Sequence, residues 1–266
     1  MGQQLLPFVF LFSFPLPGLA MIAIEDSPYL STIAKKRPWQ AVPVGKGNVV
    51  PGSEETIFRA LALRHLELPV KELLEQGMAR ELPSTPGIVE ALRSNQEDEA
   101  RHDEALSYIA AAHGTDAQAE KEVMNILKVW MEHPAHPIHK ASILERSVFF
   151  VALPFFRQNG DIGMRTVSAD ISRDERVHTA IHGMVAKELG EEDSQSLNKL
   201  RAATVAWLFD RLGKSTNQWL DKDFWLRQSQ TLFFTGKAPE MAATRASRQI
   251  AFFEAPNYDL PSYGRA

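Results

Sequence analysis

Cysteine is absent from the 266-residue sequence. Its absence excludes disulfide bonds, thiolate metal sites, iron–sulfur clusters and cysteine nucleophiles. Any metal ion must therefore be bound by histidine and carboxylate side chains, a ligand set that suits iron or manganese better than structural zinc. Strand patterns and internal repeats of about 20–50 residues are lacking as well, so the sequence predicts an all-α protein.

An excess of positive charge is also missing, since the net charge is −4 and the isoelectric point is about 6.1. This balance argues against nucleic acid as a partner. Residues 1–24 are apolar and uncharged, but they lack the basic start of a signal peptide, and Pro7, Pro15 and Pro17 disfavour a spanning helix. We interpret them as an upstream extension of the reading frame or a disordered arm, and expect a cytoplasmic protein without stable membrane insertion.

Composition and periodicity divide the chain into three segments. Residues 1–52 are predicted to form an apolar start and an extended arm that contains Trp39. Residues 53–253 show the helical spacing of apolar side chains, and residues 254–266 leave the fold as a flexible tail with two tyrosines. The expected helices span residues 53–69, 70–78, 85–114, 117–131, 140–157, 164–189, 195–212, 222–234 and 239–253.

Local signals predict several helix ends and one bend. Thr85 as N-cap and Pro86 at the first helical position are expected to begin the helix over 85–114. Pro154 is expected to kink the helix over 140–157. Gly190 is expected to end the helix over 164–189.

Two Glu-x-x-His motifs lie on these helices, Glu99 to His102 and Glu175 to His178. Their spacing places a carboxylate and an imidazole on one helix face, one turn apart, where both can bind one metal ion. Each motif alone is weak, because most glutamates belong to solvated helix faces. Here the motifs share stripes with apolar side chains such as Leu92, and a buried carboxylate is costly unless something binds it.

Two further helices each offer a carboxylate among apolar side chains. The order Glu, Glu-x-x-His, Glu, Glu-x-x-His is that of ferritin-like bundles that hold two metal ions. We therefore expect a ferritin-like helical bundle with a four-helix dimetal core and additional C-terminal helices. Two iron or manganese ions per chain, as Fe/Fe, Mn/Fe or Mn/Mn, are the expected cofactors. The predicted metal ligands are Glu67, Glu99, His102, Glu145, Glu175 and His178, with Glu55, Glu72 or Glu75 as alternatives to Glu67.

The other histidines near these motifs are interpreted as structural. His133, His136 and His139 lie in a proline-punctuated loop, where histidine more often caps or forms a turn than binds a metal. His182 lies one turn after His178 and is expected to be a core residue or a neighbour of a ligand.

The hexapeptide over 173–178, Arg-Asp-Glu-Arg-Val-His, resembles a ligand helix of the small, radical-generating subunit of class I ribonucleotide reductase. Leu144-Glu145 with its following phenylalanines is similar to that family's third ligand helix. Pro86, leading to the first Glu-x-x-His motif, is similar to its second. The likeness spans about residues 53–189.

The resemblance implies an oxidoreductase that generates and stores an oxidising equivalent, with which a large subunit reduces ribonucleotides to deoxyribonucleotides. In that family the aspartate that matches Asp174 bonds a ligand histidine and an N-terminal tryptophan, here His102 and Trp39, as a radical exit. A tyrosine of the C-terminal tail relays the radical, here Tyr258 or Tyr263, and the tail binds the large subunit. A homodimer is also expected.

The chain departs from this family where the radical tyrosine usually stands, because that position is Leu106. Tyr108 is close in sequence but points roughly 160° away around the helix. The oxidising equivalent is therefore expected on the metals or elsewhere. One alternative is a stand-alone dimetal ligand-binding oxidase or oxygenase with an apolar substrate, and another is a metal-storage or structural helical protein.

Overall fold

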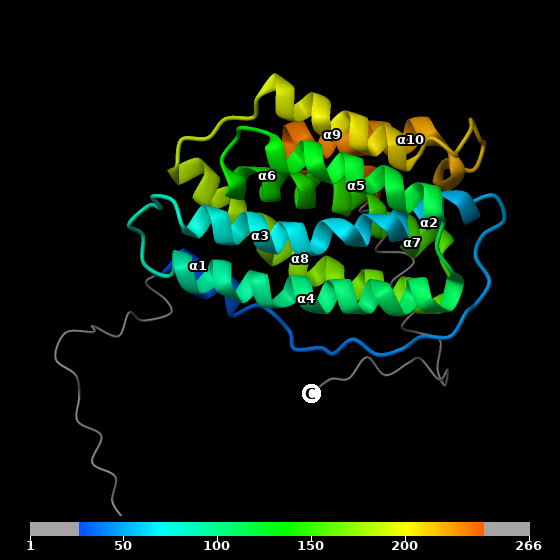
Figure 1. Cartoon of the computed structure of the whole chain (residues 1–266), viewed down its shortest axis with the longest axis horizontal. Coiled ribbons are helices and arrows are strands. Elements are labelled where there is room, and N and C mark those ends of the chain that lie inside the picture. Colours follow the sequence, from blue (N-terminus) through cyan, green and yellow to red (C-terminus); the bar gives the residue numbers. More distant parts are fainter. Residues whose placement is uncertain (1–26, 242–266) are drawn as a thin grey trace, which may run out of the picture.

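The computed structural model describes residues 27–241, and all regular structure in that range is helical (Figure 1). The prediction of an all-α protein is thereby confirmed. None of the helices in this range has the length and apolarity that crossing a lipid bilayer requires. The apolar start, most of the expected helix over 239–253, and the tail with Tyr258 and Tyr263 lie outside the described residues.

A long arm, residues 34–53, connects α1 to α2, and most later connections are short. Two short 3₁₀ turns (η2, η4) and one π-helical turn (η3) interrupt the series. In chain order the elements are α1 (Pro28–Ile33), α2 (Glu54–Ala62), η2 (Leu63–Leu66), α3 (Glu67–Met78), α4 (Ile88–His113), α5 (Ala117–Glu132), α6 (Pro137–Leu144), η3 (Glu145–Phe149), α7 (Phe150–Asn159), α8 (Ile162–Glu188), α9 (Gln195–Leu208), η4 (Gln218–Leu220) and α10 (Lys222–Thr235).

Four rods form the centre of the fold: α3, α4, α8 and the combined rod α6–η3–α7. Each packs against two others, in the ring order α3, α4, α8, α6–η3–α7. Figure 1 shows α3 and α4 side by side, with α8 behind them. Outside this ring, α9 and α10 pack on the α6–η3–α7 rod, and α5 packs on α2. The ring encloses the space into which the predicted ligands project.

The apolar stripe of α4 explains why this helix is buried on one side. Leu92, Leu106 and Ile109 lie on the buried face, and Glu99 and His102 lie between them on the same face. A helix whose apolar stripe faces the core carries every side chain of that stripe inward, polar ones included. The sequence thus buries two ionisable groups in the middle of α4.

Two helix starts differ from the sequence-based expectation. Residues 28–33 form α1 within the arm predicted to be extended, because Ser27 caps the helix and Pro28 takes its first position, where proline is favourable. The break expected at Pro69 lies earlier, at η2. Pro69 falls in the first turn of α3, where its missing N–H costs no intrahelical hydrogen bond.

The start of α4 was also predicted wrongly, since Gly87 rather than Thr85 is its N-cap. Gly87 has φ of +88°, a conformation that residues with a Cβ rarely adopt. A Cβ at this position would lie 2.6 Å from Ser27 Oγ and 2.8 Å from Leu30 Cγ, so α1 packs closely on this turn. The Thr85 hydroxyl instead donates a hydrogen bond to Glu188 (2.6 Å).

The helix predicted over residues 140–157 is longer in the structure. A kink was expected at Pro154, but the irregular turn lies earlier in the chain. The helix spans α6, η3 and α7, and its irregular turn covers Glu145–Phe149, which precedes Pro154. In this turn the Phe150 N–H donates to the Glu145 carbonyl, five residues back. The C-terminal end of α8 agrees with the prediction, because Gly190 has φ of +73° and follows the last turn.

Close packing of α3 on α6 depends on Gly77, and we predict that Gly77→Ala destabilises the fold. The new Cβ would lie 2.5 Å from Ile138 Cγ1, so we expect a loss of about 1–3 kcal/mol in the free energy of unfolding. Gly183→Ala in α8 is the matched control, because nothing lies within 4 Å of its Cβ. Alanine is the better helix former, so this variant should gain about 0.5–1 kcal/mol. Urea unfolding of both variants tests the pair, and equal effects would contradict it.

Candidate metal centre

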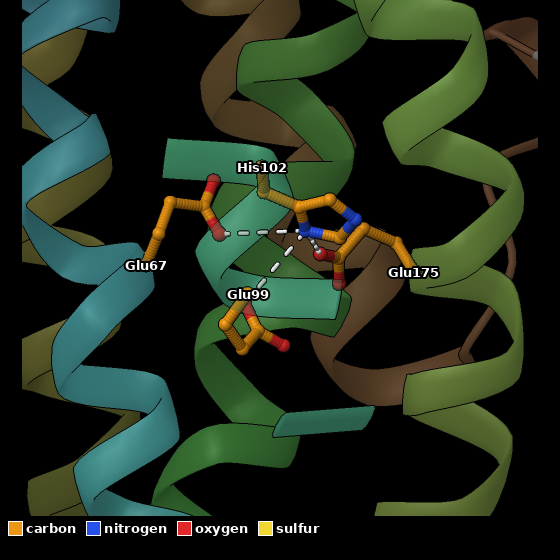
Figure 2. Close-up of side chains that lie close together, drawn as sticks. All are labelled: Glu67, Glu99, His102 and Glu175. Atoms are coloured by element: carbon orange, nitrogen blue, oxygen red, sulfur yellow. Dashed lines mark ion pairs between the residues drawn. The ribbon is translucent and has the colours of Figure 1, made fainter. Parts of the chain in front are cut away.

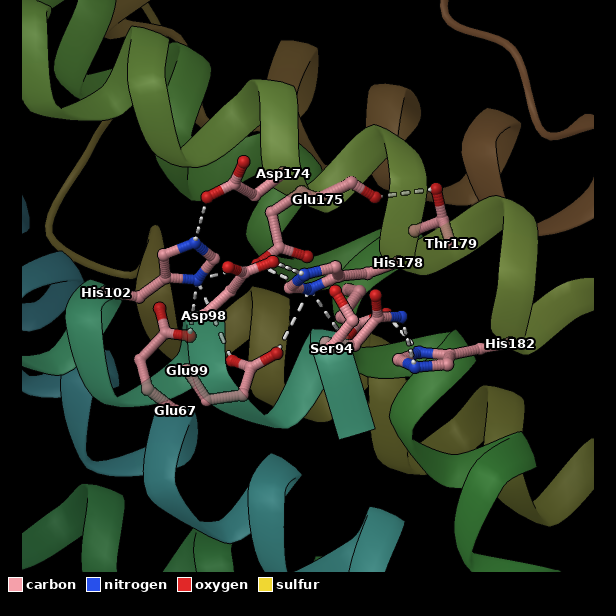
Figure 3. Close-up of polar contacts among 12 residues, drawn as sticks. Glu67, Ser94, Asp98, Glu99, His102, Asp174, Glu175, His178, Thr179 and His182 are labelled. Atoms are coloured by element: carbon pink, nitrogen blue, oxygen red, sulfur yellow. Dashed lines mark hydrogen bonds and ion pairs between the residues drawn. The ribbon is translucent and has the colours of Figure 1, made fainter. Parts of the chain in front are cut away.

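Four helical elements bring the six predicted ligands to one buried centre (Figure 2, Figure 3). None of the six side chains is more than 2% exposed. Their ligand atoms form two groups, each of which can hold a metal ion. The groups are Glu67, Glu99, His102 and Glu175, and Glu99, Glu145 and His178.

In the first group, Nδ1 of His102 faces three carboxylates (Figure 2). It lies 3.7 Å from Glu67 Oε2 and 3.7 Å from Glu99 Oε2. Glu175 Oε1 is closer, at 3.2 Å. Ligand atoms bound to one small divalent cation at about 2.1 Å lie about 3–4 Å apart. The spacing therefore fits one cation between these four side chains.

In the second group, Nδ1 of His178 has the matching position. It lies 3.0 Å from Glu99 Oε1 and 3.7 Å from Glu145 Oε1. Glu175 Oε1 is also 3.7 Å away. Glu99 thus directs one oxygen to each histidine, and Glu175 stands near both. These two carboxylates can bridge a pair of cations, while Glu67 and Glu145 each serve one side.

The inward-facing atoms lack other partners. Both oxygens of Glu99 and of Glu175, and Nδ1 of both histidines, have no hydrogen-bond partner among the described residues. The second nitrogen of each imidazole binds an aspartate, so in the neutral ring Nδ1 presents a lone pair to the lone pairs of the carboxylates. Buried acceptors that face one another are unfavourable unless a cation or proton lies between them. The donor set therefore fits two metal ions.

The same crowding shifts the pKa values of these groups. Burial raises the pKa of Glu67 well above its ordinary value. Burial, together with the nearby Glu145 carboxylate, raises the pKa of Glu175 to about 7. Burial opposes ionisation of the two imidazoles, but their carboxylate neighbours outweigh it and raise the pKa of His102 and of His178. Without metal, protons therefore take the place that cations would occupy.

Outside the ligands, Asp174 connects His102 to Trp39. Asp174 Oδ2 lies 3.2 Å from His102 Nε2 and accepts a 2.7 Å hydrogen bond from the indole N–H of Trp39. The Trp39 ring lies over the His102 ring, with centroids 6.0 Å apart and an angle of 17° between the planes. The contact between Asp174, His102 and Trp39 that the resemblance implied is therefore present.

Asp98 has the equivalent place beside His178. Its Oδ2 lies 3.0 Å from His178 Nε2 (Figure 3). Lys36 Nζ lies 2.5 Å from the same oxygen. Burial opposes ionisation of Asp98, yet His178 and Lys36 outweigh it and hold the pKa of this carboxyl well below its usual range. Each aspartate directly precedes a ligand glutamate on its own helix and orients the histidine of the other helix. Such outer carboxylates fix the tautomer and the orientation of a ligand histidine.

His182 positions a ligand rather than belonging to either group. Its Nδ1 lies 2.6 Å from Glu145 Oε2, and its Nε2 lies 3.0 Å from the Asn95 amide. Glu145 itself begins the π-helical turn, a feature that is frequent at functional sites because it redirects side chains. The turn and His182 together aim the second oxygen of Glu145 at His178.

Two of the three histidines assigned to this loop cap turns, as the sequence-based interpretation has it, whereas His139 lies inside α6 with its Nε2 3.5 Å from Asp193 Oδ1. His136 Nδ1 accepts a hydrogen bond from the Ile138 N–H (3.3 Å), and His133 Nδ1 accepts one from the Ala135 N–H (3.2 Å). Neither belongs to the two groups that can hold a metal. Leu106 is buried, and the Tyr108 hydroxyl donates to Glu104 (2.8 Å) at the helix surface.

Sequence reasoning missed Asp98, Lys36, Arg101 and Asn95. One signal for Asp98 was present, because both motifs read Asp-Glu-x-x-His, at Asp98 to His102 and at Asp174 to His178. Nothing in the spacing indicated Lys36, which reaches the site from the arm.

The chain has no match among protein-family models, among curated proteins or among solved structures. A functional assignment therefore depends on this geometry and on the sequence resemblance.

The raised pKa values predict that the metal-free protein loses stability between pH 6 and pH 8. Glu175 has a pKa of about 7 when folded, against 4.5 ordinarily, so its contribution is present at low pH and lost as pH rises through about 7. His102 and His178 act in the same direction, because their pKa values are also raised. The expected loss from Glu175 is about 1 kcal/mol, since one pKa unit corresponds to about 1.4 kcal/mol.

Urea unfolding of chelator-treated protein at both pH values measures this loss. Glu175→Gln should reduce the pH dependence, because it removes one titrating group. Glu90→Gln, at an exposed carboxylate of α4, is the control and should leave it unchanged. A metal-free protein that is more stable at pH 8 than at pH 6 would contradict the prediction.

Proposed function

We propose that this chain is the small subunit of a class I ribonucleotide reductase, which generates and stores an oxidising equivalent at two iron or manganese ions. The observation that carries the proposal is the chain of contacts from the centre through Asp174 to Trp39. A storage or purely structural site has no need of an oxidisable ring that is hydrogen-bonded behind a ligand. The resemblance of residues 173–178 to this family supports the same reading.

Two bound metal ions would supply one-electron redox chemistry and the reaction with O2 or a reduced oxygen species. Their ligands would be the six carboxylates and imidazoles described above. Burial of all six excludes water from the centre. The four carboxylates supply negative charge, which stabilises high oxidation states, while the outer aspartates fix the histidine rings.

Asp174 can accept the indole proton of Trp39 when Trp39 loses an electron. Oxidation of an indole by one electron makes its N–H strongly acidic, and Asp174 Oδ2 lies 2.7 Å from that nitrogen. The Arg101 guanidinium lies 5.0 Å from the centre of the Trp39 ring and disfavours a ring that keeps its positive charge. Asp174 is therefore the carboxylate in position to accept this proton when Trp39 is oxidised.

The remaining parts of the proposal concern partners. A large subunit would bind the C-terminal tail, and Tyr258 or Tyr263 would relay the radical to it. The chain would act as a homodimer in the cytoplasm. With Leu106 at the usual radical position, the oxidising equivalent would stay on the metals rather than on a tyrosine.

A stand-alone dimetal oxidase or oxygenase with an apolar substrate is the second candidate. A cavity of about 480 Å³ beside η3, α7 and α8 favours it. Its walls include apolar side chains such as Phe150 and Leu232, together with Arg146, Arg157 and Arg176. None of the six predicted ligands lines it, however, so a substrate there would not touch the centre without a rearrangement.

Metal analysis is the first test of the proposal. We expect about two iron or manganese ions per chain in the purified protein, because the ligand set is that of two-metal bundles. Glu99→Gln should lose most of the bound metal, since Glu99 belongs to both groups. Glu97→Gln, an exposed residue on the same helix, should bind as much metal as the unchanged protein. The proposal would be contradicted if the wild-type protein contained no metal both after growth with iron and manganese and after reconstitution with these metals.

Activity with and without a matching large subunit is the second test. Trp39→Phe should keep both metals and lose partner-dependent ribonucleotide reduction by about 100-fold, at the upper end of effects of residues outside the ligand set. Trp207→Phe is the matched control, because the Trp207 indole also donates to a carboxylate, Glu122 (2.7 Å), and has no contact with the centre. Two metals with oxidation in the absence of a partner would support the second candidate instead.

A further inference from the structure

The two halves of the centre meet at one arginine outside the ligand set. Arg101 Nη2 donates a hydrogen bond to Asp98 Oδ1 and a second, of 3.1 Å, to Asp174 Oδ2. Asp98 holds the ring of His178, and Asp174 holds the ring of His102 (Figure 3). One guanidinium group therefore contacts both aspartates that orient the ligand histidines.

Each aspartate also has a partner that it does not share. Lys36 Nζ pairs with Asp98 (2.5 Å), and the Trp39 indole donates to Asp174 (2.7 Å). Asp98 and Asp174 are both buried, and like charges in a buried space repel one another. Arg101 is the positive group that stands between them and lets both remain ionised at short range.

We propose that Arg101 couples the two metal subsites, so that occupation of one raises the affinity of the other. This inference rests on the proposed two-metal centre. A cation bound to Nδ1 of His102 would restrict the orientation of that ring. The ring restricts Asp174 through its Nε2, and Asp174 in turn restricts the Arg101 guanidinium. The guanidinium then holds Asp98, which orients the ring of His178. The second cation then meets a histidine that is already oriented and has less conformational entropy to lose.

Glu99 and Glu175 also connect the subsites, because both can bridge the cations. Removal of Arg101 leaves these bridging carboxylates unchanged, so a comparison of Arg101 variants with wild type isolates the outer route. Coupling between sites commonly changes an affinity by about 5–150-fold. We expect Arg101→Gln to lower the ratio of the second to the first association constant by about tenfold, within that range.

Mn²⁺ and electron paramagnetic resonance give a readout that needs no activity. At one Mn²⁺ per chain, coupled subsites produce a mixture of doubly loaded and empty chains, in which spin coupling suppresses the six-line signal of isolated Mn²⁺. Weaker coupling leaves more chains singly loaded and gives a stronger isolated signal. Wild type should give the weak isolated signal, and Arg101→Gln should give a clearly stronger one, although Glu99 and Glu175 still connect the subsites.

Two variants control for other effects of the substitution. Arg173→Gln removes an arginine next to Asp174 that pairs with Asp170 (2.6 Å), and it should behave as wild type. Lys36→Gln removes a partner of Asp98 only. It should weaken one subsite and leave the Arg101 bridge intact, so titration should show one lowered constant with a smaller rise in the isolated signal than Arg101→Gln gives.

The outcomes separate this inference from the proposed function. Wild type that binds no Mn²⁺ overturns the two-metal centre itself. If wild type and Arg101→Gln both bind two Mn²⁺ and give the same isolated signal at one equivalent, the coupling through Arg101 is overturned and the two-metal centre is not. Circular dichroism of the metal-free variants checks folding. Where Arg101→Gln does not fold, Arg101→Met replaces it, because its side chain keeps apolar bulk but cannot donate to either aspartate, and wild-type coupling in that variant overturns the inference.

Discussion

Four carboxylates and two imidazoles are buried together, away from water, in the middle of this bundle. The fold can keep them there only if protons or cations bind between them and offset the repulsion of the carboxylates. The inward-facing oxygens of Glu99 and Glu175 have no hydrogen-bond partner among the described residues. A carboxylate in such a place either gains a proton, as the pKa of Glu175 near 7 indicates, or binds a cation. The helices that hold these groups bury this face, so the groups are shielded from water.

Charge is balanced in layers around the centre. The ligand histidines contact Asp98 and Asp174, and these aspartates contact Lys36 and Arg101 nearer the surface. Successive layers therefore alternate in charge once cations are bound: the aspartates lie between the positive centre on one side and Lys36 and Arg101 on the other. An isolated buried ion pair stabilises a fold weakly, but an outer layer that orients metal ligands serves the site rather than the stability of the chain.

Most of the ligand set could be predicted from the sequence, because it follows from helical periodicity. Glu99, His102, Glu175 and His178 occupy stripes that also carry leucine and isoleucine, and a spacing of three residues is enough to place each pair on one face. The outer shell could not be predicted in the same way. Lys36 reaches Asp98 from a helix-poor arm, and the π-helical turn at Glu145 depends on tertiary packing that no local propensity encodes. The helix over residues 28–33 lies in a segment predicted to be extended, and proline at its first position is compatible with a helix start.

The centre is nearly symmetric in its ligands and asymmetric outside them. Each half has one histidine, one aspartate behind it and one carboxylate of its own, with Glu99 and Glu175 between the halves. Behind Asp174 stands Trp39, an oxidisable ring, whereas behind Asp98 stands Lys36, an ammonium group that cannot be oxidised under the same conditions. If the centre transfers a hole as proposed, only one of these two routes, through Asp174, ends at an oxidisable ring. In the proposed function this difference gives the transfer its direction, and Arg101, which touches both aspartates, lies where the two halves diverge.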